Sequence, residues 1–129
     1  MSTDLMYLAY TAMLTAALWL PYVVCQVKTN GPLQPADYVD PTVRPMPHWG
    51  TRAHRAYLNS VEVFAPFAAL VIVGHILGKG DAIAMWAMGF FWLRVVHALV
   101  YWLALPYIRT IVFTLGFVCE IGIFWVVVS

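Results

Sequence analysis

The chain has 129 residues, of which 63% are hydrophobic and only 10% are charged. Soluble domains carry about 25% charged residues, so the composition excludes a protein whose whole surface faces water. The net charge of +1 gives no basis for nucleic-acid binding. We therefore expect an integral membrane protein whose surface contacts membrane lipids.

Four apolar segments are long enough to cross a bilayer, which takes about 20 residues of helix. They cover approximately residues 5–27, 52–77, 82–105 and 110–128. Backbone groups find no water in the hydrocarbon core, so helices are expected there rather than open strands. The sequence predicts an all-α membrane protein, with residues 1–129 forming a single domain of four transmembrane helices.

Turn and breaker residues separate these segments. Pro21 is expected to kink the first helix, and Pro66 is expected to bend the second. Residues 28–51 are expected to form an irregular loop, because prolines at positions 32, 35, 41, 45 and 47 each remove a backbone donor. Thr51 and Asp81 are candidate N-caps for the helices that follow them.

The distribution of basic residues predicts the orientation in the membrane. Only Lys79 falls in the second connection, whereas the first and third connections and the helix ends beside them hold Lys28, Arg44, Arg52, Arg55 and Arg109. Cytoplasmic loops are enriched in Lys and Arg. The first and third connections are therefore predicted to be cytoplasmic, and both termini are predicted to lie outside.

The second segment carries polar residues on one helical face. Arg55, Asn59 and Glu62 are spaced i, i+4 and i+7, so a helix places them on the same side. Inserting a charged side chain into the membrane costs roughly 2.5–3.5 kcal/mol, and such residues tend to mark functional sites. This face is the first candidate site.

The third segment carries a second polar face. Arg94, His97 and Tyr101 are spaced i, i+3 and i+7. Arg94 lies deep in its helix and needs an anionic partner, for which Glu62 is the obvious internal candidate. Two interpretations stay open: an ion pair that only joins two helices, or part of a ligand site.

The number of cations favours a ligand site. Lys28, Arg52 and Arg109 add more positive charge to this half of the chain than Glu62 alone can neutralise. Surplus cations near an amide and a tyrosine are what a small anionic ligand requires. Pro106 is expected to end the third helix, so Thr110 lies at the N-terminus of the fourth, where free N–H groups also favour anions.

The remaining polar residues give weaker signals. Glu120 has no cation on its own helix, so we expect it either to pair across subunits or to be protonated. His75 is expected to be a histidine with a partner near the membrane surface. His48 and His54 lack cysteine partners, so no metal site is predicted. The two cysteines, at positions 25 and 119, are expected to be buried and inert.

Four motifs, in this order, resemble the MAPEG family, the membrane-associated proteins of eicosanoid and glutathione metabolism. QVK at 26–28 resembles a Gln-Val-Arg in the microsomal glutathione transferase and prostaglandin E synthase branch. RAYLNSVE at 55–62, with a proline four residues on, resembles the family's second-helix signature. RVVHALVY at 94–101 and PYIRT at 106–110 resemble that branch's Arg-x-x-His-x-x-x-Tyr pattern and its thiol-activating arginine. The chain departs from the family at Val63, where an aromatic or polar residue is usual.

The resemblance implies a homotrimer that binds glutathione as a cosubstrate between subunits, in the cytoplasmic half of the membrane. It implies that Arg109, with Thr110, stabilises the glutathione thiolate. It further implies that Lys28 comes from the neighbouring subunit. The residues that the resemblance places against glutathione are Lys28, Arg52, Arg55, Asn59, Glu62, Arg94, His97 and Tyr101.

The chemistry of glutathione fits these residues. The tripeptide carries two carboxylates and one ammonium group, so it needs several cations and one carboxylate, which Glu62 can supply. A guanidinium beside a thiol lowers its pKa from about 8.5 and so favours the nucleophilic thiolate. The second substrate is then a hydrophobic small molecule, an electrophile or a lipid hydroperoxide, that enters from the bilayer.

Two other functions remain open at this point. The same fold could serve as a non-catalytic membrane lipid-binding or scaffold protein, with a pocket but no activated thiol. It could also be an accessory subunit of a larger membrane complex, in which Arg94, Glu62 and Glu120 serve assembly only. A scaffold has no use for a cation at the thiol position. The glutathione-dependent enzyme is therefore favoured by the joint presence of Arg55, Asn59, Glu62, Tyr101 and Arg109.

Overall fold

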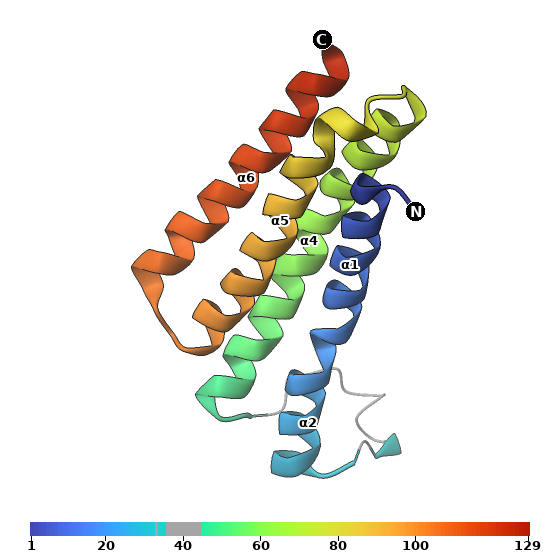
Figure 1. Ribbon diagram of the computed structural model, residues 1–129. Coiled ribbons are helices and arrows are strands. Elements are labelled where there is room, and N and C mark those ends of the chain that lie inside the picture. The colour runs from blue at the N-terminus through green and yellow to red at the C-terminus, as the bar shows by residue number, and fades with distance from the viewer. Residues whose placement is uncertain (33, 36–44) are drawn as a thin grey trace.

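A computed structural model describes residues 1–32, 34–35 and 45–129, so Pro41 and Arg44 lie outside the described residues. The described residues contain no strand and form the helices α1 (Thr3–Ala17), α2 (Trp19–Asn30), α4 (His48–Ile76), α5 (Gly80–Trp102) and α6 (Pro106–Val128) (Figure 1). Since α1 and α2 together form one span, four stretches are long and apolar enough to cross a membrane. The predicted all-α membrane fold is confirmed.

Two prolines lie inside the spans and act differently. The first span is interrupted at Leu18, three residues before Pro21. The physical reason is that a proline offers no N–H to the carbonyl four residues earlier, here that of Ala17, and its ring crowds that carbonyl. Pro66, by contrast, lies within α4, which stays continuous although the Glu62 carbonyl loses its usual donor.

Both predicted N-caps are wrong by a few residues. The N-cap of α4 is Pro47, which puts Thr51 inside the helix. The N-cap of α5 is Lys79, which puts Asp81 in the first turn, where its charge still complements the helix dipole. Neither helix N-terminus has a side-chain cap, so a capping residue in the sequence cannot locate the start of either helix.

The last helix also begins earlier than its apolar run. Pro106 occupies the first position of α6, where its missing N–H is no loss. The turn before it contains Ala104, whose φ of 58° is left-handed. The backbone N–H of Arg109 donates to the Leu105 carbonyl at 3.1 Å, so Arg109 lies within the helix rather than before it.

The helices run side by side, with both termini at one end of the bundle and α2 at the other (Figure 1). α5 packs against α1, α4 and α6, and α2 packs against the beginning of α4. The rings of Phe67 and Phe90 stack with centroids 4.0 Å apart at the α4–α5 contact. They belong to a small core that also contains Val71, Ile83, Ala87, Cys119 and Ile123.

At the end that carries the termini, three polar residues form what we call the termini-end cluster: Asp4, His75 and Lys79. The Asp4 side chain is 1% exposed and its Oδ2 lies 2.9 Å from Nδ1 of His75. Lys79 Nζ donates to the carbonyls of Val126 and Val127 at 3.0 and 3.1 Å and so caps the end of α6. His75 therefore has a partner, as the sequence predicted.

Candidate functional site

Three helices line a pocket near the opposite end of the bundle. Its volume is about 280 Å³, close to the lower end of the range of about 300–1,000 Å³ that is usual for small-molecule sites. We call it the polar pocket, and it is lined by Asn59 of α4, His97 and Tyr101 of α5, and Arg109, Thr110 and Phe113 of α6. Five of these six residues are among the predicted site residues.

Arg109 is held against Tyr101 by a cation–π contact. The guanidinium carbon lies 4.6 Å from the centroid of the Tyr101 ring. Among the described residues the guanidinium has no carboxylate within ion-pair distance. The Thr110 hydroxyl donates to the Pro106 carbonyl at 3.3 Å. The positive charge of Arg109 therefore has a fixed position and remains available to an anion in the pocket.

Arg94 lies behind the pocket and is only 4% exposed. Its Nη2 donates to Oδ1 of Asn59 at 2.7 Å and to Oγ of Ser60 at 2.9 Å. The expected Arg94–Glu62 ion pair is absent from the described residues, and Glu62 is exposed. The reason is rotation: Glu62 is two residues beyond Ser60, about 200° around the helix, and so faces away from α5.

His97 is buried and keeps one ring nitrogen without a partner. The side chain is 2% exposed, and its ring centroid lies 5.5 Å from that of Tyr101 and 6.2 Å from that of Phe113. Among the described residues its Nδ1 has no hydrogen-bond partner. Buried polar groups are normally paired, so this nitrogen marks the pocket wall as a place for a ligand or a water molecule.

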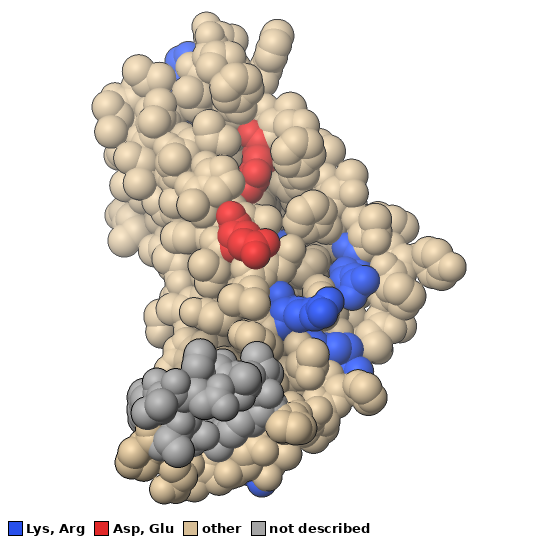
Figure 2. All heavy atoms as spheres, turned by 180° about the vertical axis from the view of Figure 1, so that it is seen from behind, with Lys and Arg blue, Asp and Glu red and all other residues tan. Residues whose placement is uncertain are grey.

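Besides Arg94, four predicted site residues do not line the polar pocket. Lys28, Arg55 and Glu62 are exposed, the first on α2 and the others on α4. Arg52 donates through Nε to the Trp102 carbonyl at 3.2 Å and so satisfies the C-terminus of α5. Figure 2 shows the far face of the bundle, where basic side chains gather in the lower half and acidic side chains lie above them.

Sequence reasoning missed two residues that shape this region. Ser60 gives no distinct signal in the sequence, because a serine in an apolar helix usually bonds to its own backbone. Phe113 lies one turn after Arg109 on α6, and that i, i+4 spacing was the signal that could have placed it in the pocket.

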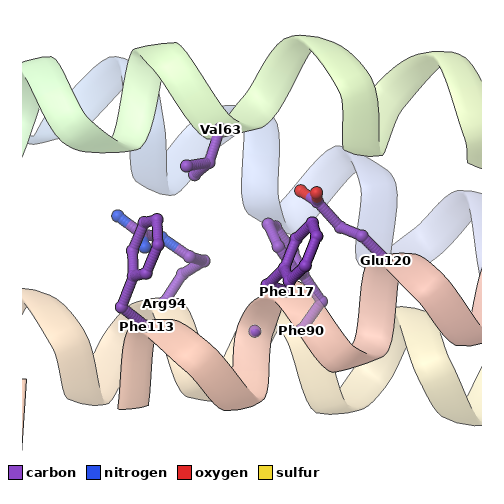
Figure 3. Close-up of a pocket in the computed structure, with 7 residues that line it drawn as sticks. Val63, Phe90, Arg94, Phe113, Phe117 and Glu120 are labelled. Atoms are coloured by element: carbon purple, nitrogen blue, oxygen red, sulfur yellow. The ribbon is translucent and has the colours of Figure 1, made fainter. Parts of the chain in front are cut away.

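A smaller cavity adjoins the polar pocket, and Phe113 lines both. Its volume is about 40 Å³, and we call it the central cavity. Figure 3 shows Arg94 at one side of it and the carboxylate of Glu120 at the other. Glu120 thus has a cation across the cavity on α5, although it has none on its own helix.

The four spans make this an integral, multi-pass membrane protein. The MAPEG family model matches residues 5–129, so the chain belongs to the MAPEG family. This is a four-helix membrane family whose members include glutathione transferases and peroxidases. Comparisons with curated proteins and with solved structures found no match.

Proposed function

We propose that this protein is a membrane-bound, glutathione-dependent transferase or peroxidase of the microsomal glutathione transferase and prostaglandin E synthase type. It activates the glutathione thiol for attack on lipophilic electrophiles or lipid hydroperoxides. The observation that carries the proposal is the polar pocket, where the Arg109 guanidinium has no carboxylate partner among the described residues and shares the lining with Asn59, His97 and Tyr101.

The wall formed by α4 and α5 suits the carboxylates of glutathione. Since the Asn59 oxygen accepts from Arg94, the amide NH₂ of Asn59 is oriented away from Arg94 and is available to a ligand. The buried Nδ1 of His97 and the phenol of Tyr101 offer further hydrogen-bonding groups on the same wall. Arg94 therefore acts as a positioning residue, because it orients Asn59.

The α6 side of the pocket suits the thiol. The contact with Tyr101 limits the freedom of the Arg109 side chain, so little entropy is lost when it meets an anion. A cation beside a thiol lowers the thiol pKa, and the N-terminal turn of α6 adds positive dipole. Thr110 also lines the pocket, but it is the fifth residue of α6 and so lies one turn past the helix N-terminus where the sequence placed it.

We further propose that the site is completed by a neighbouring subunit in a homotrimer. Glu62 and Arg55 are exposed on the single chain although they lie on a helix that spans the membrane. Charged side chains at such positions face protein or water rather than lipid. A neighbouring subunit gives these residues, and Lys28, a place at the edge of the pocket on the cytoplasmic side.

One observation favours the alternative, a membrane lipid-binding protein without an activated thiol. A groove of about 190 Å³ lies beside the central cavity, and we call it the lipid-side groove. It is lined by Leu70, Phe117, Glu120, Ile121 and Phe124. Such a groove suits an apolar lipid chain and needs no activated thiol, so activity has to be measured directly.

The test is activity of the purified protein in detergent with glutathione and either an aryl halide or an organic hydroperoxide. We expect wild-type activity to fall at least tenfold in Arg109→Ala, because an unactivated thiol with a pKa of about 8.5 is only a few per cent ionised at pH 7. Asp81→Asn, an exposed position at the other end of α5, is the matched control and retains activity. Wild-type protein that catalyses neither reaction would contradict the proposal.

A further inference from the structure

The central cavity contains two buried polar atoms that lack a partner among the described residues. One is Nε of Arg94, although Nη2 of the same guanidinium has two acceptors. The other is Oε1 of Glu120. Arg94 belongs to α5 and Glu120 to α6, and both residues line the same cavity. In Figure 3 the carboxylate of Glu120 points toward α4, and the ring of Phe117 lies between Glu120 and Arg94 in this view.

The chemistry of these two atoms identifies the group that would satisfy both. An arginine N–H can only donate, and an ionised carboxylate oxygen can only accept. A hydroxyl oxygen accepts one hydrogen bond and donates another, so a single O–H group can join Arg94 to Glu120. The cavity volume of about 40 Å³ admits a group of this size, since one water-sized probe needs about 10–15 Å³.

The surroundings identify what carries this hydroxyl. Phe117 and Glu120 line both the central cavity and the lipid-side groove, so the two spaces adjoin at these residues. Among the described residues, Glu120 is the one charged residue in the lining of that groove. A molecule that places an apolar chain in the groove therefore presents its polar group to Glu120.

The same molecule extends toward the polar pocket. Phe113 lines both the central cavity and the polar pocket, so the three spaces follow one another along α6. Arg109 and Glu120 are eleven residues apart, which is about 16 Å along a helix. A group bound at Glu120 is thus too far from Arg109 to be the reacting group.

We propose that Arg94 and Glu120 form a recognition site for a hydroxyl group on a long-chain lipid that lies along α6. The lipid is the second substrate, and in this respect alone the inference rests on the proposed function. Glu120 then determines specificity: it selects a chain whose hydroxyl lies about 16 Å from its reactive end. A lipid that lacks the hydroxyl leaves both buried atoms without a partner.

The experiment compares two probes in equilibrium binding to the full-length protein in mild detergent. One probe is a long-chain fatty acid methyl ester with a mid-chain hydroxyl, and the other is the same ester with that hydroxyl methylated. We expect wild type to bind the hydroxy ester about tenfold more tightly, which corresponds to 1.4 kcal/mol. Glu120→Ala abolishes this preference, whereas Glu120→Gln, which keeps an acceptor oxygen, retains part of it.

Thr114→Val is the matched control on the same helix. Thr114 is exposed and its hydroxyl donates to the Thr110 carbonyl, away from both cavities, so the variant keeps the wild-type preference. Equal binding of the two probes to wild type would overturn the inference, and this comparison needs no variant to fold. A preference that persists in Glu120→Ala, or a loss of oligomeric state in that variant, would also overturn it.

The two proposals fail separately. Glu120→Ala is expected to form the glutathione thiolate as wild type does, because Glu120 does not line the polar pocket. Absence of thiolate in wild type would contradict the enzymatic proposal and leave the hydroxyl preference standing. The reverse result, thiolate without any preference between the probes, would remove only the recognition site.

Discussion

The two ends of the bundle differ in whether their polar side chains have partners within the chain. In the termini-end cluster, Asp4 contacts His75, and Lys79 binds the last carbonyls of α6. In the polar pocket, the guanidinium of Arg109 faces an aromatic ring, and Nδ1 of His97 has no partner among the described residues. Both ends belong to helices that can span a membrane. Each side chain of the termini-end cluster has a partner within the chain, although Oδ1 of Asp4 has none among the described residues.

This difference distinguishes polar residues that stabilise the fold from polar residues that are available to bind a ligand. A polar group in an apolar environment costs free energy unless it is paired, so each one needs a partner from somewhere. Each of the three side chains of the termini-end cluster has a partner within the chain, and these contacts hold the helix ends together. The polar pocket leaves groups for a partner from outside the chain, which is the property of a binding site.

Replacing Arg94 by Met should have the largest effect. The variant loses the charge-assisted hydrogen bonds to Asn59 and Ser60, each worth about 1.5–3 kcal/mol. We expect glutathione affinity to fall at least tenfold, as measured by calorimetry, because Asn59 loses its orientation. Lys79→Met, the same exchange of a long cation at the termini end, lowers stability but keeps the affinity. Equal loss of glutathione affinity in both variants would contradict this, because it would show that the termini-end cluster affects binding in the polar pocket.

Replacing Asp4 by Ala tests the termini end alone. Removing the carboxylate leaves His75 without its acceptor, and we expect the free energy of unfolding to fall by about 1–3 kcal/mol. His75→Ala should cost a similar amount, and the double variant should cost less than the sum, since both changes remove one contact. Additive losses would mean that the 2.9 Å contact contributes no stability.

Two glycines of α6 compare packing at the middle of the bundle with packing nearer the termini end. A Cβ at Gly122 would lie 2.5 Å from the indole ring of Trp86, whereas at Gly116 the nearest atom, on Phe90, is 3.9 Å away. We expect Gly122→Ala to cost about 1–3 kcal/mol of unfolding free energy through overpacking. Gly116→Ala should be neutral or stabilise by about 0.5–1 kcal/mol, because alanine favours helix. Thermal unfolding of both variants with equal melting temperatures would contradict this.

The smallest effect on stability is expected at Arg55. The side chain is exposed and has no hydrogen bond or ion pair among the described residues, so Arg55→Ala should change the unfolding free energy by less than about 0.5 kcal/mol. Glutathione affinity should nevertheless fall several-fold if a neighbouring subunit completes the site. Unchanged affinity in a calorimetric titration would remove Arg55 from the proposed site.

Hydropathy and helical spacing predicted a large part of this architecture. The four spans followed from runs of apolar residues, and the i, i+3 and i+7 spacing of Arg94, His97 and Tyr101 placed them on one face of α5. The helix ends were less predictable, because neither α4 nor α5 uses a side-chain cap. Likewise, the effect of Pro21 appears at Leu18, since a proline acts on the turn that precedes it.

Partners across helices could not be predicted from the sequence. Spacing along α4 gives the relative directions of Asn59, Ser60 and Glu62, but not the rotation of the helix against α5. That rotation decides that Arg94 meets Asn59 and Ser60, and that Glu62 faces outward. The contact between Arg52 and the Trp102 carbonyl could not be predicted either. The helix α5 ends three residues before the predicted end at residue 105, so Trp102 was not expected to be its last residue.

The most direct test of the central claim is ultraviolet difference spectroscopy of glutathione bound to the purified protein at neutral pH. We expect thiolate absorbance with wild type and with Asp4→Ala, which changes only the paired end of the bundle. The absorbance should be lost in Arg109→Ala, because the cation that favours the thiolate is gone. Absence of thiolate in wild type, or undiminished thiolate in Arg109→Ala, would contradict the assignment of the polar pocket as a glutathione-activating site.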